Sequence, residues 1–139
     1  MKIQAPSTVH ELRINGDWSQ YSGTITLPKS ISKLYVSGKD IPFGIVASQN
    51  FEIDVVSPRT KELYITRDLS QCKGTVSFSK NISKISFAMD KPGFSIGGTS
   101  ILTIGTTTPE ITTMTFKPGI LNRKGIVLID TNVKTVSIE

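Results

Sequence analysis

The feature that most constrains the fold of this 139-residue chain is an internal repeat. Six segments share one pattern: an apolar residue or Thr, two free positions, an apolar residue, one free position and a last apolar residue. They begin at residues 9, 31, 60, 82, 111 and 133. The differences between successive starts are 22, 29, 22, 29 and 22, so two unit lengths alternate, and one of each makes a 51-residue super-repeat. A fixed period of this kind is typical of stacked repeat architectures.

Within the units, the spacing of apolar residues is that of β-strands. Leu12 and Ile14 stand two apart, as do the corresponding residues of the other units, and this period indicates a strand with one buried face. Further short strands are expected at residues 23–27, 43–47, 74–78, 94–98 and 125–129, and the long units add strands at 51–56 and 101–105. No window carries a helical period, so we predict an all-β chain. Its length fits one repeat domain, residues 1–139, in which residues 1–8 form a lead-in.

The charges at the outward positions predict how the units stack. The residue before the central apolar position is Glu11, Lys33, Glu62 and Lys84 in the first four units. Opposite charges on neighbouring strands contribute about 0.2–1 kcal/mol, so this column favours stacking of consecutive units. We therefore expect a short parallel β-solenoid of about six coils, with alternating 22- and 29-residue units. The alternative is a threefold β-trefoil or β-prism, against which the third copy of the super-repeat, residues 111–139, is shorter than the first two.

The repeat units carry a resemblance to a known family. The segments LRINGD, LYVSGK and LYITRD, each with an apolar residue or Thr three positions before the leucine, resemble the LxxLxLxxN core of leucine-rich repeats. The segment TITLPKSISKLYV, Thr24 to Val36, is similar to the bacterial-surface type of this repeat. The resemblance implies an exposed parallel sheet that is used for protein recognition and carries no chemistry.

Groups suited to catalysis or metal binding are sparse. The chain has one histidine, His10, and one cysteine, Cys72. We interpret them as a corner histidine and a packing thiol, because no general base or nucleophile constellation surrounds either in the sequence. Glu52 and Asp54 alternate on one expected strand and are interpreted as a solvated edge, since the next super-repeat does not copy them. We predict no enzymatic activity, no metal and no cofactor.

The candidate binding residues lie at outward positions of the expected sheet. Arg13, Tyr35 and Tyr64 occupy equivalent positions of three consecutive units and are expected to form one exposed column. Tyrosine and arginine are enriched at protein interfaces and also stack on sugars or bases. Lys33 and Lys84 add a basic ridge to a chain whose net charge is +5, but intervening glutamates make nucleic acid a disfavoured partner. We predict that these five residues bind another protein, with a glycan as the alternative.

The last segment, residues 133–139, is expected to end on a strand with no polar cap, and such an edge invites pairing with another chain. We therefore predict a non-enzymatic protein-recognition module. The alternatives are a carbohydrate-binding adhesin or phage tail-fibre-like segment, and a structural subunit of a homo-oligomer joined through this strand. Neither a signal peptide nor an apolar run of about 18 residues is found, so we expect no membrane partner. The expected location is the cytoplasm or a larger exported or virion assembly.

Overall fold

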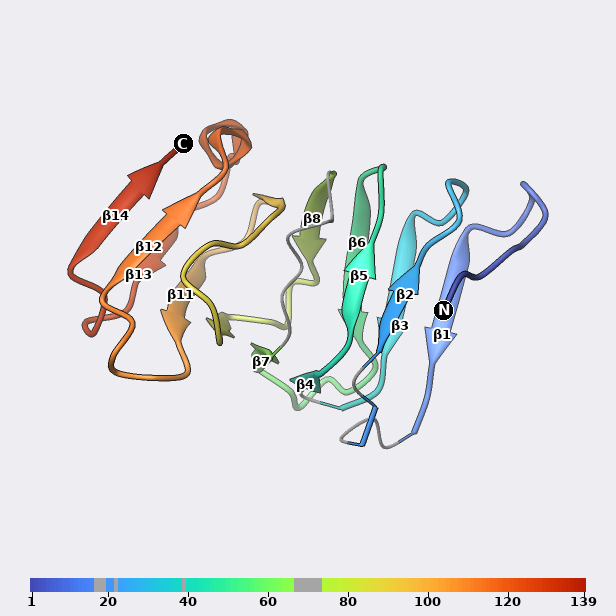
Figure 1. Ribbon diagram of the computed structural model, residues 1–139, viewed down its shortest axis with the longest axis horizontal. Coiled ribbons are helices and arrows are strands. Elements are labelled where there is room, and N and C mark those ends of the chain that lie inside the picture. Colours follow the sequence, from blue (N-terminus) through green and yellow to red (C-terminus); the bar gives the residue numbers. More distant parts are fainter. Residues whose placement is uncertain (17–19, 22, 39, 67–73) are drawn as a thin grey trace.

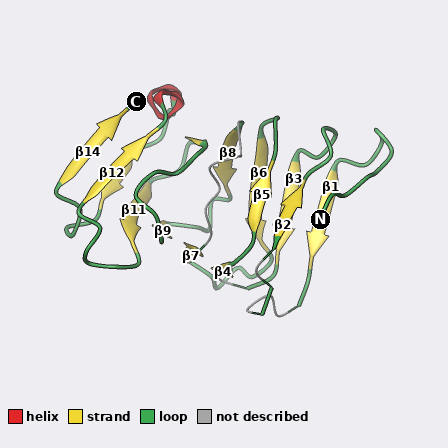
Figure 2. Ribbon diagram, viewed as in Figure 1, coloured by secondary structure: helices red, strands yellow, loops and turns green. Residues whose placement is uncertain are grey.

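A computed structural model describes residues 1–16, 20–21, 23–38, 40–66 and 74–139 of the chain (Figure 1). Cys72 and the last residues of the three leucine-rich-repeat-like motifs, Asp17, Lys39 and Asp68, lie outside these ranges. The strands are β1 (Glu11–Ile14), β2 (Thr24–Thr26), β3 (Lys33–Val36), β4 (Asp40–Ile41), β5 (Gly44–Val46), β6 (Phe51–Val55), β7 (Glu62–Ile65), β8 (Thr75–Phe78), β9 (Lys84–Phe87), β10 (Ser95–Gly97), β11 (Leu102–Thr106), β12 (Thr113–Phe116), β13 (Val127–Ile129) and β14 (Thr135–Ile138). A short 3-10 helix, η1 (Pro118–Asn122), lies near the C-terminal end (Figure 2). All the strands expected from the sequence are present; β4 and η1 are additional.

The strands pair in parallel and wind into a coil with three sides. The first sheet has the strand order β1-β3-β6-β8-β10, and the second has the order β4-β7-β9-β11-β13. The pairs β2–β5 and β12–β14 form the third side near the two ends of the coil. Along the chain β2, β3 and β4 belong to three different sheets, and β5 then returns to lie beside β2. The fold is the predicted parallel β-solenoid, with about five turns where about six were expected, and the closed trefoil or prism alternative is wrong.

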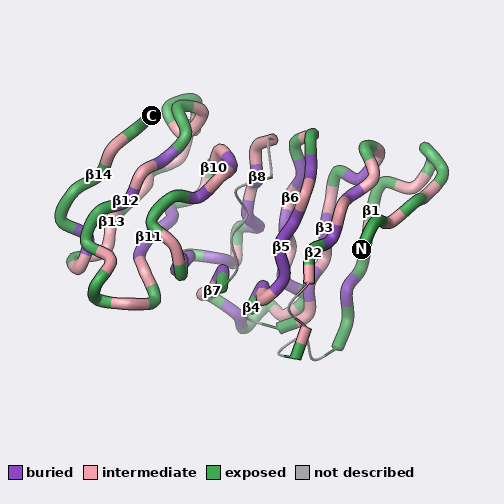
Figure 3. The backbone as a smooth tube through the Cα atoms, in the orientation of Figure 1, coloured by how far each residue is buried: buried purple, intermediate pink, exposed green. Residues whose placement is uncertain are grey.

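Buried residues lie along the strands of the coil (Figure 3). Leu12, Leu34, Ile53 and Phe78 stack in register along the first sheet, and Leu34 and Ile53 are fully buried. Each turn therefore buries its apolar positions against the turns before and after it. This is the packing expected of a solenoid, whose stability is a sum of nearest-neighbour contacts.

The super-repeat is not a whole number of turns. The stacked residues Leu12, Leu34, Ile53 and Phe78 of the first sheet differ in residue number by 22, 19 and 25 in turn, so the mean step is 22. A 51-residue shift is thus about two and a third turns. Accordingly β1 and β3 lie in the first sheet, their equivalents β7 and β9 lie in the second, and β12 and β14 lie on the third side.

This geometry corrects the predicted charge column. Glu11 pairs with Lys33, and Glu62 pairs with Lys84, as expected for units separated by the short step. The next neighbour of Lys33, however, is Glu52 on β6. The long step carries the chain to another side of the coil, so the two pairs belong to different sheets and do not form one column.

Every repeat unit begins at a corner of the coil. In all six units the backbone N–H of the first residue donates to the carbonyl three residues earlier, as from Ile31 to Pro28 at 3.1 Å. This is the hydrogen bond of a β-turn. Amide side chains from the next turn cover two of the corners: Gln49 Nε2 donates to the Pro28 carbonyl at 2.8 Å, and Asn81 Nδ2 donates to the Ser57 carbonyl at 3.3 Å. The unit boundaries in the sequence therefore coincide with the corners of the coil.

Candidate functional site

The structure brings three of the five predicted binding residues together. Pairing of β1 with β3 places Arg13 beside Tyr35, and Lys33 stands two positions before Tyr35 on the same outward face. Tyr64 and Lys84 lie on β7 and β9, in the second sheet. The prediction of one column holding Arg13, Tyr35 and Tyr64 is therefore wrong. We call the outward residues of β1, β3 and β6 the Tyr35 face: Glu11, Arg13, Lys33, Tyr35, Glu52 and Asp54.

Tyr35 stands at the centre of this face. The guanidinium carbon of Arg13 lies over its ring, 4.0 Å from the centroid, and Lys33 Nζ lies 4.9 Å from the same centroid. The Tyr35 hydroxyl donates to Glu11 Oε1 at 3.3 Å. A cation is attracted by the electron-rich face of an aromatic ring, by about 0.5–1 kcal/mol at exposed sites. These contacts hold the half-buried ring in one orientation on the sheet.

Carboxylates balance the two cations of the Tyr35 face. Arg13 Nη2 lies 3.8 Å from Glu11 Oε2, and Lys33 Nζ lies 3.6 Å from Asp54 Oδ2. The pKa of Lys33 is raised, first by its side-chain contact with Tyr35; partial burial opposes this shift, and the negative charges of Glu52 and Asp54 add to it. Lys33 is therefore charged at neutral pH. The face presents alternating positive and negative groups, not the basic ridge predicted from the sequence.

Sequence reasoning missed the part that Glu52 and Asp54 play. Their strand, β6, lies between β3 and β8 inside the first sheet, so the interpretation of this pair as a solvated edge is wrong. Asp54 stands directly beside Tyr35 in the register. The length of the long unit is the signal that could have shown this. A 29-residue unit exceeds the 22-residue turn by seven residues, about the length of one side of the coil.

A shallow hollow of about 390 Å³ adjoins the Tyr35 ring. One wall is formed by Arg13, Tyr35 and Asp54, and the other by the end of β6 and the corner after it. Val56, on this second wall, is 48% exposed. The hollow thus combines an aromatic ring, an exposed aliphatic side chain and a charged rim, and it has room for a side chain from a partner.

The second sheet carries the equivalent group one super-repeat later. Lys84 Nζ lies 3.8 Å from Glu62 Oε1 and 3.1 Å from Asp130 Oδ2. The Ser86 hydroxyl donates to Glu62 Oε1 at 2.8 Å. Ser86 takes the position that Tyr35 has in the first sheet, while Tyr64, in the position of Arg13, pairs with Ser86 in the register. The side-chain hydrogen bond with Glu62 raises the pKa of Tyr64, so the ring of this group stands beside the ion pairs.

Gly105 allows Asp130 to reach Lys84. It takes the position of Asp54 one super-repeat later, and a Cβ at Gly105 would lie 2.8 Å from Asp130 Oδ2. The hydrogen bond with Lys84 lowers the pKa of Asp130 and raises the pKa of Lys84. In both sheets the lysine therefore has a carboxylate partner. In the first sheet it comes from the adjacent strand, and in the second Glu62 of the adjacent strand β7 is joined by Asp130 from the end of β13, two strands away.

Of the other groups singled out in the sequence, Cys72 lies outside the described residues and His10 lies within them. His10 is exposed, and its Nδ1 donates to the Ser30 carbonyl at 3.1 Å. Within the described ranges, no group of three or more histidine, cysteine and acidic side chains is arranged to hold a metal ion. The same ranges hold no helix that is long and apolar enough to cross a membrane.

Comparison of the chain with protein-family models, curated proteins and solved structures finds no significant match. The function has to be inferred from the geometry of the chain itself.

Proposed function

We propose that the protein is a non-enzymatic recognition module that binds another protein through the Tyr35 face. The observation that carries this proposal is the pairing of Tyr35 and Arg13 beside a hollow with the exposed Val56. Tyrosine and arginine are among the residues that most often dominate the binding energy of a protein interface. They do so beside a pocket from which water is excluded when the partner binds. The exposed parallel sheet implied by the leucine-rich-repeat resemblance supports the same function.

The contacts of the Tyr35 face indicate what kind of partner it suits. The hollow suits an apolar side chain, and the alternating charges around it suit a partner with charges of both signs, because complementary charges set the orientation of a complex. A glycan would have to stack on a ring that Arg13 already covers at 4.0 Å. A protein is therefore favoured over a glycan at this face.

Site-specific crosslinking tests the proposal. A photoreactive amino acid is placed at Val56, and as a control at Thr103 on the second sheet, in cells that contain the natural partners. We expect a discrete crosslinked protein from position 56 only. Tyr35→Ala should weaken that complex by at least about 2 kcal/mol, roughly 30-fold in Kd, as for an interface hot spot. The matched variant Tyr64→Ala, which removes the tyrosine of the second sheet, should leave it intact.

Equal crosslinking from both positions, or an equal loss with Tyr64→Ala, would count against the Tyr35 face. The same variants on a glycan array address the adhesin alternative. Binding to a sugar that disappears with Tyr35→Ala would replace the protein partner by a carbohydrate.

A second candidate function is self-association through the C-terminal end of the coil. Met114 and Phe116 of β12 are buried, and Val136 and Ile138 of β14 lie beside them in register. Val136 is nevertheless 43% exposed, and Ile138 is 44% exposed, although both occupy inward positions. A second copy seated on this end would bury them. Full burial of such side chains is worth about 1.5–3 kcal/mol each.

Light scattering over a range of concentrations tests this candidate. We expect the chain to form a dimer or larger assembly that the double variant Val136→Lys with Ile138→Lys converts to a monomer. Ser137→Lys is the matched control, since it adds a lysine to the same strand on its outward side. A wild-type chain that stays monomeric at every concentration would contradict self-association.

A further inference from the structure

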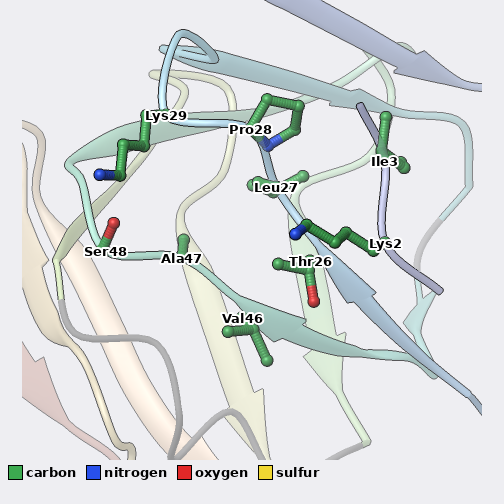
Figure 4. Close-up of a pocket in the computed structure, with 9 residues that line it drawn as sticks. All are labelled: Lys2, Ile3, Thr26, Leu27, Pro28, Lys29, Val46, Ala47 and Ser48. Atoms are coloured by element: carbon green, nitrogen blue, oxygen red, sulfur yellow. The ribbon is translucent and has the colours of Figure 1, made fainter. Parts of the chain in front are cut away.

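A second hollow lies on the third side of the coil, on a different side from the Tyr35 face (Figure 4). It has a volume of about 350 Å³ and is lined by residues 2–3, 26–29 and 46–48, which come from three neighbouring segments of the coil. This volume falls at the lower end of the range of about 300–1,000 Å³ for small-molecule pockets.

The register explains why the walls of this pocket are apolar. Lys2 forms a bridge with Thr26, and Thr26 pairs with Val46, so the outward side chains of three successive segments stand in one row. The Leu27 N–H donates to the Val46 carbonyl at 2.9 Å, which satisfies both of these backbone groups. What remains to line the pocket is mainly the aliphatic surface of the partly exposed Val46, Ile3 and Pro28, while the buried Leu27 and Ala47 lie at its floor.

Two lysines give the pocket a positive charge. In Figure 4 the amine of Lys2 points toward the middle of the ring of lining residues, and Lys29 lies at the other end, near Ser48. No carboxylate is among the lining residues, and in the described part of the chain neither lysine belongs to an ion pair. Lys33 and Lys84 differ in this respect, because each has a carboxylate partner.

We propose that this pocket binds a small carboxylic acid with an apolar body, of the medium-chain fatty acid kind. Burial of the apolar body against Val46, Ile3 and Pro28 supplies the favourable transfer from water. The carboxylate meets the amine of Lys2, which forms no ion pair in the described part of the chain, and Lys29 adds a second positive charge at the other end of the pocket. The proposal concerns a different side of the coil from the Tyr35 face and does not depend on the function proposed for that face.

Titration of the protein with decanoate, followed by the shifts of its backbone amides in NMR spectra, tests the proposal. We expect saturable shifts centred on the amides of Leu27 and Ala47. The double variant Lys2→Glu with Lys29→Glu should raise the Kd by at least about tenfold, because charge reversal replaces attraction by repulsion. Lys80→Glu is the matched control: Lys80 is the exposed lysine equivalent to Lys29 one super-repeat later, and it does not line the pocket. Decanol, which has the same chain and no charge, should bind more weakly than decanoate.

Three outcomes would overturn the proposal: no saturable shifts at millimolar decanoate, an equal loss with Lys80→Glu, or equal affinity for decanol. Val46→Trp fills the pocket from an outward, partly exposed position, and it should abolish binding while the circular dichroism spectrum stays that of the wild type. Retained binding in this variant would place the ligand elsewhere. Tyr35→Ala should leave the affinity for decanoate unchanged, so a failure of either proposal can be told apart from a failure of the other.

Discussion

At the scale of single residues, the glycines that recur with the super-repeat mark places where successive turns approach closely. Gly23, Gly74 and Gly125 are equivalent under the 51-residue shift. A Cβ at Gly74 or Gly125 would meet a backbone carbonyl of the preceding turn, whereas a Cβ at Gly23 would meet the hydroxyl end of the Tyr21 side chain. Backbone cannot give way as easily as the end of a side chain. The glycine at this repeat position is therefore held by neighbouring backbone in the second and third copies and by a side chain in the first copy.

We expect Gly125→Ala to lower the free energy of unfolding by about 1–3 kcal/mol, the usual cost of overpacking. Its added methyl group would overlap the Ser100 carbonyl. Gly23→Ala should cost less, because its added methyl group would meet the end of a side chain and not backbone. Urea unfolding of the two variants beside the wild type measures both values. A larger loss for Gly23→Ala would show that the approach of the turns is not the constraint.

The ion pair between Lys84 and Asp130 predicts a dependence of stability on pH. The folded-state pKa of Asp130 is lowered from 3.8, chiefly by the hydrogen bond with Lys84. An acid with a depressed folded pKa stabilises the fold above its unfolded pKa and loses this contribution as the pH falls through the folded value. Wild-type protein should therefore lose more stability than Asp130→Asn when the pH is lowered from neutral to below 3.8.

Lys84 gives the matching behaviour at alkaline pH. Its folded-state pKa is raised from 10.5, so its contribution is present below 10.5 and is lost as the pH rises through the folded value. Denaturant midpoints over the pH range measure both limbs. Gly105→Ala would push the Asp130 carboxylate away from Lys84. Like Asp130→Asn, it should therefore reduce the change of stability with pH at both the acidic and the alkaline end. A wild-type profile parallel to that of Asp130→Asn would mean that this pair does not contribute to stability.

At the scale of elements, side-chain hydrogen bonds join the corners of successive turns. The Asn81 side chain donates to the carbonyls of both Ser57 and Thr60, each at 3.3 Å, and so ties one corner to the corner of the preceding turn. A partly buried carbonyl that loses its donor costs about 1–3 kcal/mol. We expect Asn81→Ala to lower the free energy of unfolding by an amount in this range.

Thermal and urea unfolding of Asn81→Ala measure this loss, with the exposed Asn122→Ala as the control. The control should change the stability by less than about 0.5 kcal/mol, as most surface substitutions do. Equal effects of the two substitutions would show that the corner hydrogen bonds are replaced by water at no cost.

At the scale of the whole molecule, the coil is a one-dimensional stack of turns, in which an inner strand such as β6 pairs with a strand on each side. The central turns contain fully buried residues such as Leu34, Ile53 and Ile85. Among the described residues, the strand β14 pairs with β12 alone. In such a stack local stability rises from the ends toward the middle, because each interior turn is held from both sides.

Hydrogen exchange measures this gradient. We expect amides of β14 to exchange faster than those of β6 under native conditions, since opening β14 breaks one inter-strand ladder and opening β6 breaks two. If two copies associate through the C-terminal end, protection of β14 should increase with protein concentration while that of β6 stays constant. Uniform protection along the chain would mean that the coil opens as a single unit.

The strand positions, the all-β class and the solenoid could be predicted from the sequence because their causes are local. Alternation of Leu12 and Ile14 defines a strand with one buried face, and the short and long steps repeat because each unit starts at a corner turn. Part of the candidate site was local too. Arg13, Lys33 and Tyr35 meet because β1 and β3 are one short step apart, which is the length of one turn.

The neighbours of each strand across the long steps, in contrast, depend on the folded coil as a whole. A long step adds seven residues to a turn, which moves the chain on by about one side of the coil, so Tyr64 leaves the Tyr35 face and Asp54 takes the place beside Tyr35. Glu62 was predicted beside Lys84, but the second carboxylate there could not be predicted, since Asp130 reaches Lys84 across the strand that holds Gly105. Strand periodicity records which residues point inward. It does not show which turn or side of the coil supplies the strand next to a given strand, because that depends on the summed length of all the corners between the two strands.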